Sequence, residues 1–293
     1  MLALWIWGGI AAMPCMALAA SSSSSATLEQ IYERAWKRAS RVDYVVPEAE
    51  ELAATERLFA RLMRGQQRSS TIAELRERGW SVHTQRMGEA TWTIVSEAAD
   101  QRSGRGLYAI SDRGRHALQA PHVPSDARTG EILLAYAADT GGASPRALAW
   151  NTVHRKNADL ARLPDTYLVA FSRAFARVFP DERILQLHGF DASKRRSAAG
   201  AYSSAIVSSG HAYPSSALKS SVKCMQQGIE KRTRLYGVDV SELGATRNPV
   251  AHALEADGYH GFVHVELDPK MRKRLATDAA QRKKLLACLG GDL

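Results

Sequence analysis

Residues 146–190 read RALAWNTVHRKNADLARLPDTYLVAFSRAFARVFPDERILQLHGF, and this stretch decides the fold class. Its two ends are short and largely apolar, which is typical of buried strands. Between them, residues 164–179 place large apolar side chains at helical spacing behind Pro164 and Asp165, which favour a helix start. A strand, an amphipathic helix and a second strand predict an α/β sheet covered by helices.

The same alternation continues on both sides of this stretch. Helices are predicted at residues 129–142, 214–237 and 268–290, and strands at residues 116–122, 201–209 and 261–267. Upstream, the spacing of apolar residues predicts helices at residues 27–42, 48–64 and 70–79, followed by strands at residues 80–87, 90–98 and 106–114. We therefore expect an α/β fold with N-terminal helices and a mixed, largely parallel central sheet with helices on both faces.

The first residues differ in composition from the rest. Residues 1–20 contain no charged side chain, and Ala17-Leu18-Ala19 has the small-x-small form of a signal-peptide cleavage site. A transmembrane anchor is the alternative, because about 20 apolar residues can just span a bilayer. The Gly pair and Pro14 favour cleavage. We expect a signal peptide at residues 1–19, no stable membrane insertion after its removal, and a periplasmic or secreted protein.

A Ser-rich linker at residues 20–27 then leads into one domain at residues 28–293, since no repeat or Pro-rich linker divides it. Within this domain we distinguish an N-terminal extension, about residues 28–115, from a core, about residues 116–293. Cys224 and Cys288 remain after cleavage, and in an exported chain they either form a disulfide or stay separate thiols.

The net charge of +9 permits binding to an acidic polymer, an anionic lipid or a nucleic acid. No zinc-finger spacing, aromatic RNA-binding signature or helix-turn-helix pattern accompanies the basic residues, so no nucleic-acid partner is expected. The nucleophile elbow, the phosphate-binding loop and the dinucleotide-binding glycine motif are also missing from the sequence.

Two histidines follow apolar strands. His122 and Asp126 are four residues apart across a loop that contains Pro124, and His188 lies at the end of another strand. Imidazoles and carboxylates are natural zinc ligands, and a hydrolytic zinc needs three of them and one open position. Because sites in open α/β sheets form at the carboxyl ends of strands, these three residues are candidate ligands of Zn²⁺. Ordinary loop residues are the alternative interpretation.

A hydrolytic zinc also needs a group that moves protons. Glu266 stands in the apolar strand at residues 261–267, on the same side as Phe262 and His264. An inward-facing carboxylate there is costly to bury without a role. Glu266 is therefore the candidate general base, and the polar side of an edge strand is the alternative.

From about residue 120 onward, the chain resembles the zinc carboxypeptidase-like hydrolases, and especially the phage-type poly-γ-glutamate hydrolases and their N-formylglutamate amidohydrolase relatives. Those enzymes have a His, an acid five residues later, a Thr three further on and another acid after two more. "PHVPSDARTGE" offers His122, Asp126, Thr129 and Glu131 in that order. The resemblance implies a carboxypeptidase-like fold and places His122 and Asp126 among the metal ligands.

Two further motifs extend the resemblance. "LQLHGF" is similar to the family's second His strand, which makes His188 a ligand, and "GFVHVELDPKMRKRL" makes Glu266 the base and Arg272 the following Arg. The sequence departs from the family at Asp126, which is Asp rather than Glu and one residue closer to His122. Glu131 remains the alternative carboxylate ligand.

Several polar residues are candidates for holding the substrate. Arg155 is the first choice for a catalytic role, because an Arg near a hydrolytic zinc can clamp a carboxylate or polarise a carbonyl. Asn151 lies at the same strand end, and Arg247 and Asn248 form a second polar loop. Together with Arg272, these residues are the predicted substrate-binding set, and exposed loop residues are the alternative for each.

These observations predict an exported zinc-dependent amidohydrolase or carboxypeptidase-like peptidase. Its substrate would be peptide-like or an acidic polymer, such as a γ-glutamyl chain or a cell-wall peptide. The alternative is a non-catalytic basic envelope protein that binds an anionic cell-wall polymer on a hydrolase-like scaffold.

Overall fold

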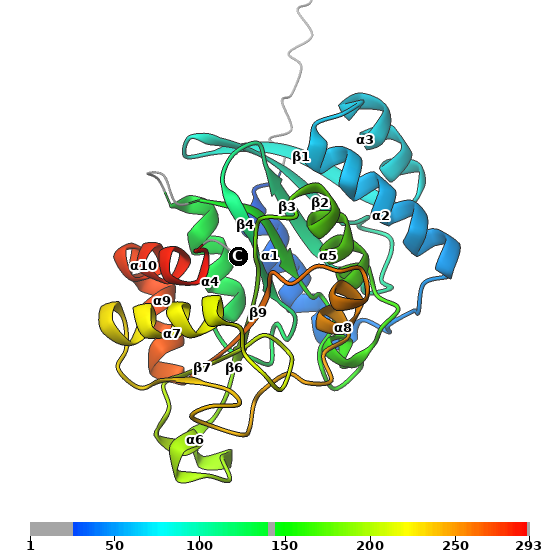
Figure 1. Cartoon of the computed structure of the whole chain (residues 1–293). Helices are drawn as coiled ribbons and strands as arrows, with labels where there is room; N and C mark the ends of the chain where they lie inside the picture. The colour runs from blue at the N-terminus through cyan, green and yellow to red at the C-terminus, as the bar shows by residue number, and fades with distance from the viewer. Residues whose placement is uncertain (1–25, 140–143, 292–293) are drawn as a thin grey trace, which may run out of the picture.

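The computed structural model describes residues 26–139 and 144–291, and its centre is one nine-stranded sheet in the order β1-β2-β3-β5-β4-β6-β9-β7-β8 (Figure 1). The strands are β1 (Trp80–Met87), β2 (Ala90–Glu97), β3 (Leu107–Ser111), β4 (Arg115–Ala120), β5 (Pro145–Trp150), β6 (Ile184–Gly189), β7 (Ala205–Ser208), β8 (Thr233–Leu235) and β9 (Phe262–Leu267). The α-helices are α1 (Leu28–Arg38), α2 (Ala49–Arg64), α3 (Arg68–Glu77), α4 (Thr129–Ala138), α5 (Tyr167–Val178), α6 (Ala198–Tyr202), α7 (Ser216–Gly228), α8 (Pro249–Ala256), α9 (Pro269–Thr277) and α10 (Ala279–Leu289). Short 3-10 helices are η1 (Ala39–Arg41), η2 (Leu160–Arg162) and η3 (Ala192–Lys194).

The sheet is mixed, and helices cover both of its faces, which confirms the predicted α/β class. The expectation that the sheet is largely parallel is wrong, because antiparallel pairings are as many as parallel ones. Its parallel pairings are β4–β5, β4–β6, β6–β9 and β7–β8. The pairings β1–β2, β2–β3, β3–β5 and β7–β9 are antiparallel. Parallel pairing is thus concentrated in the core half. The strands β1, β2 and β3 follow one another without an intervening helix, and a parallel pair needs such a crossover.

Two apolar clusters lie on opposite faces of the sheet. One contains buried side chains of α1, α4, α7, α9 and α10, and the other contains those of α2, α3, α5 and α8. In β9, Val263, Val265 and Leu267 belong to the first cluster and Phe262 to the second. Because side chains alternate along a strand, His264 and Glu266 point toward the α5 and α8 side, as the sequence pattern predicted.

A row of buried polar residues crosses this second face of the sheet. Gln119 in β4 pairs with Gln186 in β6, which pairs with His264 in β9, which pairs with Ser208 in β7. We call these four residues the polar row. Each is at most 4% exposed. Buried polar groups need hydrogen-bond partners, so such a row in a sheet core points to a structural or functional requirement.

Several element boundaries differ from the predictions. Residues 214–237 do not form one helix, because α7 ends at Gly228 and the chain then adds β8 to the sheet edge. The terminal helix is divided at Asp278, whose side chain accepts from the Gln281 N–H and starts α10. The strand predicted at residues 201–209 begins only at Ala205, after the short helix α6, and the strand predicted to reach His122 ends at Ala120. A further helix, α8, begins where a polar loop was expected.

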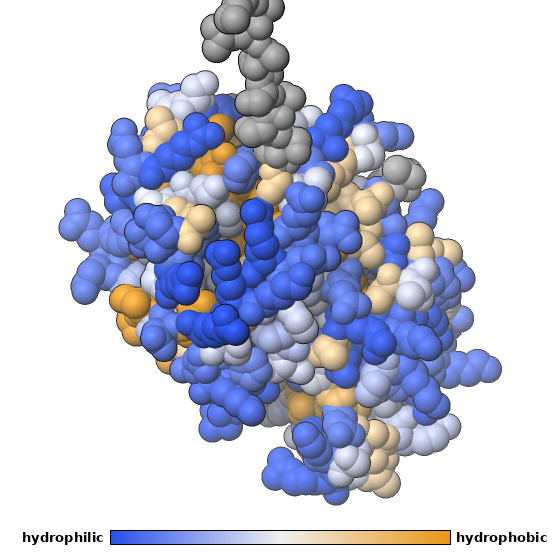
Figure 2. All heavy atoms as spheres, turned by 180° about the vertical axis from the view of Figure 1, so that it is seen from behind, coloured by the Kyte–Doolittle hydropathy of each residue, from blue (hydrophilic) through white to orange (hydrophobic). Residues whose placement is uncertain are grey.

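The predicted signal peptide, its cleavage site and most of the Ser-rich linker lie outside the described residues. Within residues 26–139 and 144–291, no helix has the length and apolar character needed to cross a bilayer. The face seen in Figure 2 is largely hydrophilic, with small apolar patches between charged side chains. Cys224 of α7 and Cys288 of α10 are joined by a disulfide.

Candidate metal centre

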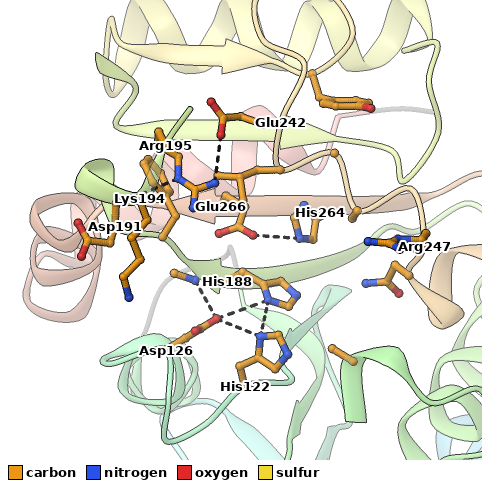
Figure 3. A pocket seen from close by; sticks show the side chains of 18 of the residues that line it. His122, Asp126, His188, Asp191, Lys194, Arg195, Glu242, Arg247, His264 and Glu266 are labelled. Atoms are coloured by element: carbon orange, nitrogen blue, oxygen red, sulfur yellow. Dashed lines mark hydrogen bonds and ion pairs between the residues drawn. The ribbon is translucent and has the colours of Figure 1, made fainter. Parts of the chain in front are cut away.

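A cavity of about 1110 Å³ opens at the edge where β6 and β9 end (Figure 3). These two strands are parallel neighbours, and His188 and Glu266 are register partners near their carboxyl ends. His122 lies in the turn that follows β4, the other parallel neighbour of β6. All three side chains line the cavity, as do those of Asp126 and His264. The location agrees with the usual place of sites in α/β sheets.

Three ligand atoms converge at this edge. The Nδ1 atoms of His122 and His188 are 3.0 Å apart. The Oδ2 atom of Asp126 lies 3.3 Å from Nδ1 of His122 and 3.5 Å from Nδ1 of His188. A tetrahedral zinc with bonds of about 2.0–2.1 Å holds its ligand atoms about 3.3 Å apart, by simple geometry. The triangle therefore has the dimensions of one face of a zinc coordination tetrahedron.

The hydrogen bonds of the two imidazoles indicate which ring nitrogen of each histidine carries the proton. His122 donates its Nε2–H to Oδ1 of Asp159 over 2.9 Å, and His188 donates its Nε2–H to Oε1 of Gln186 over 3.0 Å. Each neutral ring then has a lone pair at Nδ1, and the two lone pairs face each other beside a carboxylate oxygen. A positive charge among the three atoms, either a proton or a metal ion, would relieve this arrangement. Two imidazole nitrogens and one carboxylate oxygen are a donor set that fits Zn²⁺.

The turn at residues 122–126 explains how the side chains of His122 and Asp126 reach the same point although they are only four positions apart. The Asp126 N–H donates to the His122 carbonyl over 2.9 Å, which closes a one-turn loop and brings both side chains to one point. The Gly189 N–H donates to Oδ2 of Asp126 over 2.9 Å, and the Thr129 hydroxyl donates to the Asp126 carbonyl over 2.8 Å. Glu131 is exposed on α4. The structure thus brings Asp126, and not Glu131, to the two histidines.

The electrostatics of the triangle follow from this geometry. Burial alone would raise the pKa of Asp126, but its hydrogen bonds with His122 and His188 hold that pKa well below the usual range. Burial also opposes protonation of His122, yet the hydrogen bonds with Asp126 and Asp159 raise its pKa. Burial lowers the pKa of His188. The triangle thus presents an ionised carboxylate to one histidine that favours a positive charge and one that stays neutral.

Glu266 lies beside the triangle and keeps a different protonation state. Burial raises the pKa of its carboxyl group to about 8. Its Oε1 atom is 3.6 Å from Nε2 of His264, and its Oε2 atom is buried without a hydrogen-bond partner among the described residues. A carboxyl group that titrates near neutral pH at a cavity wall can accept and return a proton.

The predicted catalytic residue Arg155 lines the cavity, but its Nε–H is committed to Oδ2 of Asp159 over 3.0 Å. Arg162 approaches the same oxygen, with Nε at 3.4 Å. Burial would raise the pKa of Asp159, but hydrogen bonding to His122 brings it to about 2. In this structure Arg155 therefore holds the carboxylate that orients His122, and Asp159 is the residue that sequence reasoning did not select.

Two of the predicted substrate-binding residues have structural partners instead. The Asn151 amide donates to the Pro121 and Val153 carbonyls, and its oxygen accepts from the Val153 N–H. Asn151 is buried and is not among the described residues that line the cavity. Asn248 lines the cavity, but its oxygen caps α8 and its amide donates to Oε1 of Gln186 over 2.6 Å. Both side chains are fully used within the protein.

Arg272 and Arg247 both reach the cavity. Arg272 is almost buried, donates from Nη1 to the Leu267 carbonyl over 3.0 Å, and packs so closely on Gly189 that a Cβ there would lie 1.7 Å from Nη1. Arg247 is exposed and, within the described part of the chain, forms no salt bridge. The same holds for Lys194 and Arg196, which also line the cavity.

Figure 3 shows Lys194 and Arg195 on one side of the His188 and Glu266 pair and Arg247 on the other. Arg195 pairs with Glu242 over 3.4 Å. The cavity thus has cationic side chains on both sides of the candidate metal centre, and most of its carboxylates are engaged by partners. This distribution favours an anionic ligand.

The residues that sequence reasoning missed are those that orient the ligands. Gln186 and Gln119 each follow directly on a buried Leu in a strand, two or three residues before a histidine that reaches the triangle. That pattern, an isolated Gln in a buried strand shortly before a His, was the available signal. His264, two residues before Glu266 on the same face of β9, offered a similar one.

No known family model matches the chain, and no curated protein matches it. Among solved structures, a Shewanella amazonensis protein provisionally named a metallopeptidase is 12% identical and superposes with a TM-score of 0.37. The match covers 76% of this chain and 92% of the Shewanella chain. An aspartoacylase family protein of Mesorhizobium loti is 15% identical over 71% of this chain and 70% of its own, with a TM-score of 0.40. A second provisionally named metallopeptidase, from Shewanella denitrificans, is 13% identical over 75% of this chain and 88% of its own, with a TM-score of 0.35.

Proposed function

We propose that the protein is an exported zinc-dependent hydrolase that cleaves an amide bond in an anionic, peptide-like substrate. The observation that carries this proposal is the triangle of His122 Nδ1, His188 Nδ1 and Asp126 Oδ2, in which two imidazole lone pairs and a carboxylate face one point. The raised pKa of Glu266 beside this point supports it, because amide hydrolysis needs a group that gains and loses a proton.

His122, Asp126 and His188 would hold the metal at the wall of the cavity. Zn²⁺ supplies Lewis acidity in such sites, where it lowers the pKa of a coordinated water to near 7. Glu266 would take a proton from the attacking water and deliver it to the leaving amine. Arg272, held rigidly against Gly189, supplies a fixed positive charge at the wall of the same cavity.

The cations of the cavity support an anionic substrate. Lys194, Arg196 and Arg247 are exposed cavity residues that form no salt bridge within the described part of the chain. A chain with carboxylates on both sides of the cleaved bond, such as a γ-glutamyl or cell-wall peptide, would place negative charges near both cationic walls. Export is supported by the charge-free residues 1–20 and by the disulfide between Cys224 and Cys288, since disulfides persist in oxidising compartments.

The test compares wild-type protein with the His188→Ala variant. After loading and removal of excess metal, we expect wild-type protein to retain one zinc per chain and to hydrolyse γ-glutamyl or cell-wall peptides, and the variant to lose both properties. The measurements are metal content by mass spectrometry and release of new amino groups. Equal zinc content in the two proteins would contradict the ligand assignment.

The non-catalytic alternative, binding of an anionic polymer, is favoured by the same unpaired cations. The Glu266→Gln variant separates the two functions, because the substitution keeps the shape of the side chain and removes its ability to exchange a proton. Loss of hydrolysis with retained polymer binding supports the enzyme. Wild-type protein that binds the polymer but releases no amino groups supports the binding protein.

A further inference from the structure

We propose that Gln186 and Asn248 are positioning residues that fix the tautomer of His188, so that its Nδ1 lone pair is available to a metal. This inference rests on the proposed zinc site and names the residues that determine which nitrogen of its ligand His188 carries the proton. Neither residue faces the substrate through a free polar atom. Both belong to a buried hydrogen-bond relay that begins and ends at backbone groups.

The relay starts at the backbone of α5. The Ser172 hydroxyl donates to the Leu168 carbonyl over 2.6 Å and accepts from Nε2 of Gln119 over 2.8 Å. Oε1 of Gln119 then accepts from Nε2 of Gln186 over 2.9 Å. Because the Leu168 carbonyl can only accept, each amide along the relay must point its N–H₂ group toward α5. Gln186 therefore presents its oxygen, and not its nitrogen, to His188.

A second backbone anchor imposes the same direction from the opposite end. Oδ1 of Asn248 accepts from the N–H groups of Val250 and Ala251 at the start of α8. Since backbone N–H groups can only donate, the amide nitrogen of Asn248 must point away from the helix, and it donates to Oε1 of Gln186 over 2.6 Å. Two anchors on different helices thus make Oε1 of Gln186 an acceptor.

His188 must adapt to this fixed acceptor. Its Nε2 atom lies 3.0 Å from Oε1 of Gln186, so Nε2 carries the proton and Nδ1 carries the lone pair. The opposite tautomer would place two acceptors 3.0 Å apart in a buried site, and its proton on Nδ1 would occupy the atom that has to bind the metal. Partners that fix a ligand's tautomer typically change metal affinity by about 10–100-fold when they are removed.

The sharpest test is Asn248→Asp, which keeps the shape of the side chain and its capping oxygen but replaces the donor with an acceptor. Gln186 and Gln119 would then have to turn together, with the Ser172 hydroxyl leaving the Leu168 carbonyl to donate to Oε1 of Gln119. His188 would then have to move its proton to Nδ1. We expect zinc affinity, measured by competition with a chromogenic chelator, to fall about 10–100-fold. In metal-free protein, two-dimensional ¹⁵N NMR should show Nε2 protonated in wild type and Nδ1 protonated in the variant.

Two further variants at Gln186 and one control complete the experiment. Gln186→Leu removes the acceptor and should weaken zinc binding by a similar factor, whereas Gln186→Glu keeps an acceptor toward His188 and should weaken binding less, although it gives up the donor to Gln119. Ser208→Ala is the matched control, because Ser208 belongs to the same polar row but donates to the Gly244 carbonyl and does not contact the relay. Thermal unfolding of each metal-free variant separates loss of folding from loss of the tautomer.

The outcomes distinguish this inference from the proposed function. If Asn248→Asp and Gln186→Leu fold and bind zinc as tightly as wild type, with Nε2 of His188 still protonated, the positioning role is wrong even though the zinc site stands. If wild type binds no zinc, the proposed function fails, and the NMR comparison of the metal-free proteins still decides whether the relay sets the tautomer.

Discussion

At the scale of single residues, the site depends on carboxyl groups that are kept in different protonation states close to His122 and His188. Asp126 and Asp159 are ionised because histidine hydrogen bonds outweigh the effect of burial on their pKa. Glu266 has no such partner, and burial raises its pKa to about 8. The contrast supports the proposed proton-transfer role of Glu266.

The raised pKa of Glu266 predicts a pH-dependent stability in metal-free protein. The ordinary pKa of a glutamate is about 4.3, so the folded state favours the protonated form. Its contribution is complete below about pH 4.3 and is lost as the pH rises through about 8. The unfolding free energy of wild type relative to Glu266→Gln should therefore fall over this interval, by up to about 1.4 kcal/mol per pH unit.

Denaturant unfolding of both proteins at pH 5, 6.5, 8 and 9, with a chelator present, measures this difference. The Gln side chain does not titrate. Subtracting the unfolding free energy of Glu266→Gln from that of wild type therefore cancels the contributions of all other titrating groups. A difference that stays constant between pH 5 and pH 8 would show that Glu266 is not held in its protonated form.

At the scale of elements, the sequence predicted what local patterns encode. The amphipathic spacing in α5, the alternation in β9 and the His residues near strand ends are all local signals, and they were sufficient for the mixed α/β class. They made His122, Asp126 and His188 candidates only together with the resemblance to a known family. Strand β8 could not be predicted, because Thr233–Leu235 is too short to show a period and is a strand only through its pairing with β7. The hydrogen bond from His122 to Asp159 joins residues 37 positions apart, which no spacing rule reaches.

The loop that carries Asp159 is held by the N-terminal extension. The Asn157 amide donates to the Ser40 and Val42 carbonyls, over 3.2 and 3.0 Å, and the His154 N–H donates to the Ala39 carbonyl over 3.0 Å. The extension therefore does more than pack at the edge of the domain. It fixes the loop that orients one candidate metal ligand.

Replacing Asn157 with Ala should loosen this loop. Loss of the two hydrogen bonds should lower the unfolding free energy by about 1–3 kcal/mol and speed the hydrogen exchange of the His154 amide. Lys156→Ala, at an exposed neighbouring position, is the control and should leave both measurements near wild type. Unchanged exchange in the Asn157 variant would show that the loop keeps its conformation without the extension.

At the scale of the whole molecule, the disulfide and the candidate site lie on different faces of the sheet. Cys224 and Cys288 join α7 to α10 across 64 residues, and both helices pack in the apolar cluster opposite the polar row. A bridge of this length stabilises mainly by restricting the unfolded chain. Its effect should therefore be on stability and not on the geometry of the metal centre.

The double variant Cys224→Ala/Cys288→Ala should lose about 2–4 kcal/mol of unfolding free energy while keeping the zinc affinity of wild type. Thermal unfolding and the chelator competition measure the two quantities on the same samples. A fall in zinc affinity comparable with that of His188→Ala would show that the bridge also shapes the site.

The position of β9 in the sheet sets the order in which the molecule can be completed. This strand is the last in the chain, yet it lies between β6 and β7 and supplies Glu266. Until residues 262–267 are available, the edge of β6 stays open and β7 has no neighbour on that side. Such late, non-local insertion is slow, because the chain must close long loops before it gains any contact. The candidate site is therefore completed only by the C-terminal part of the chain, because Glu266 comes to lie beside His188 when β9 pairs with β6.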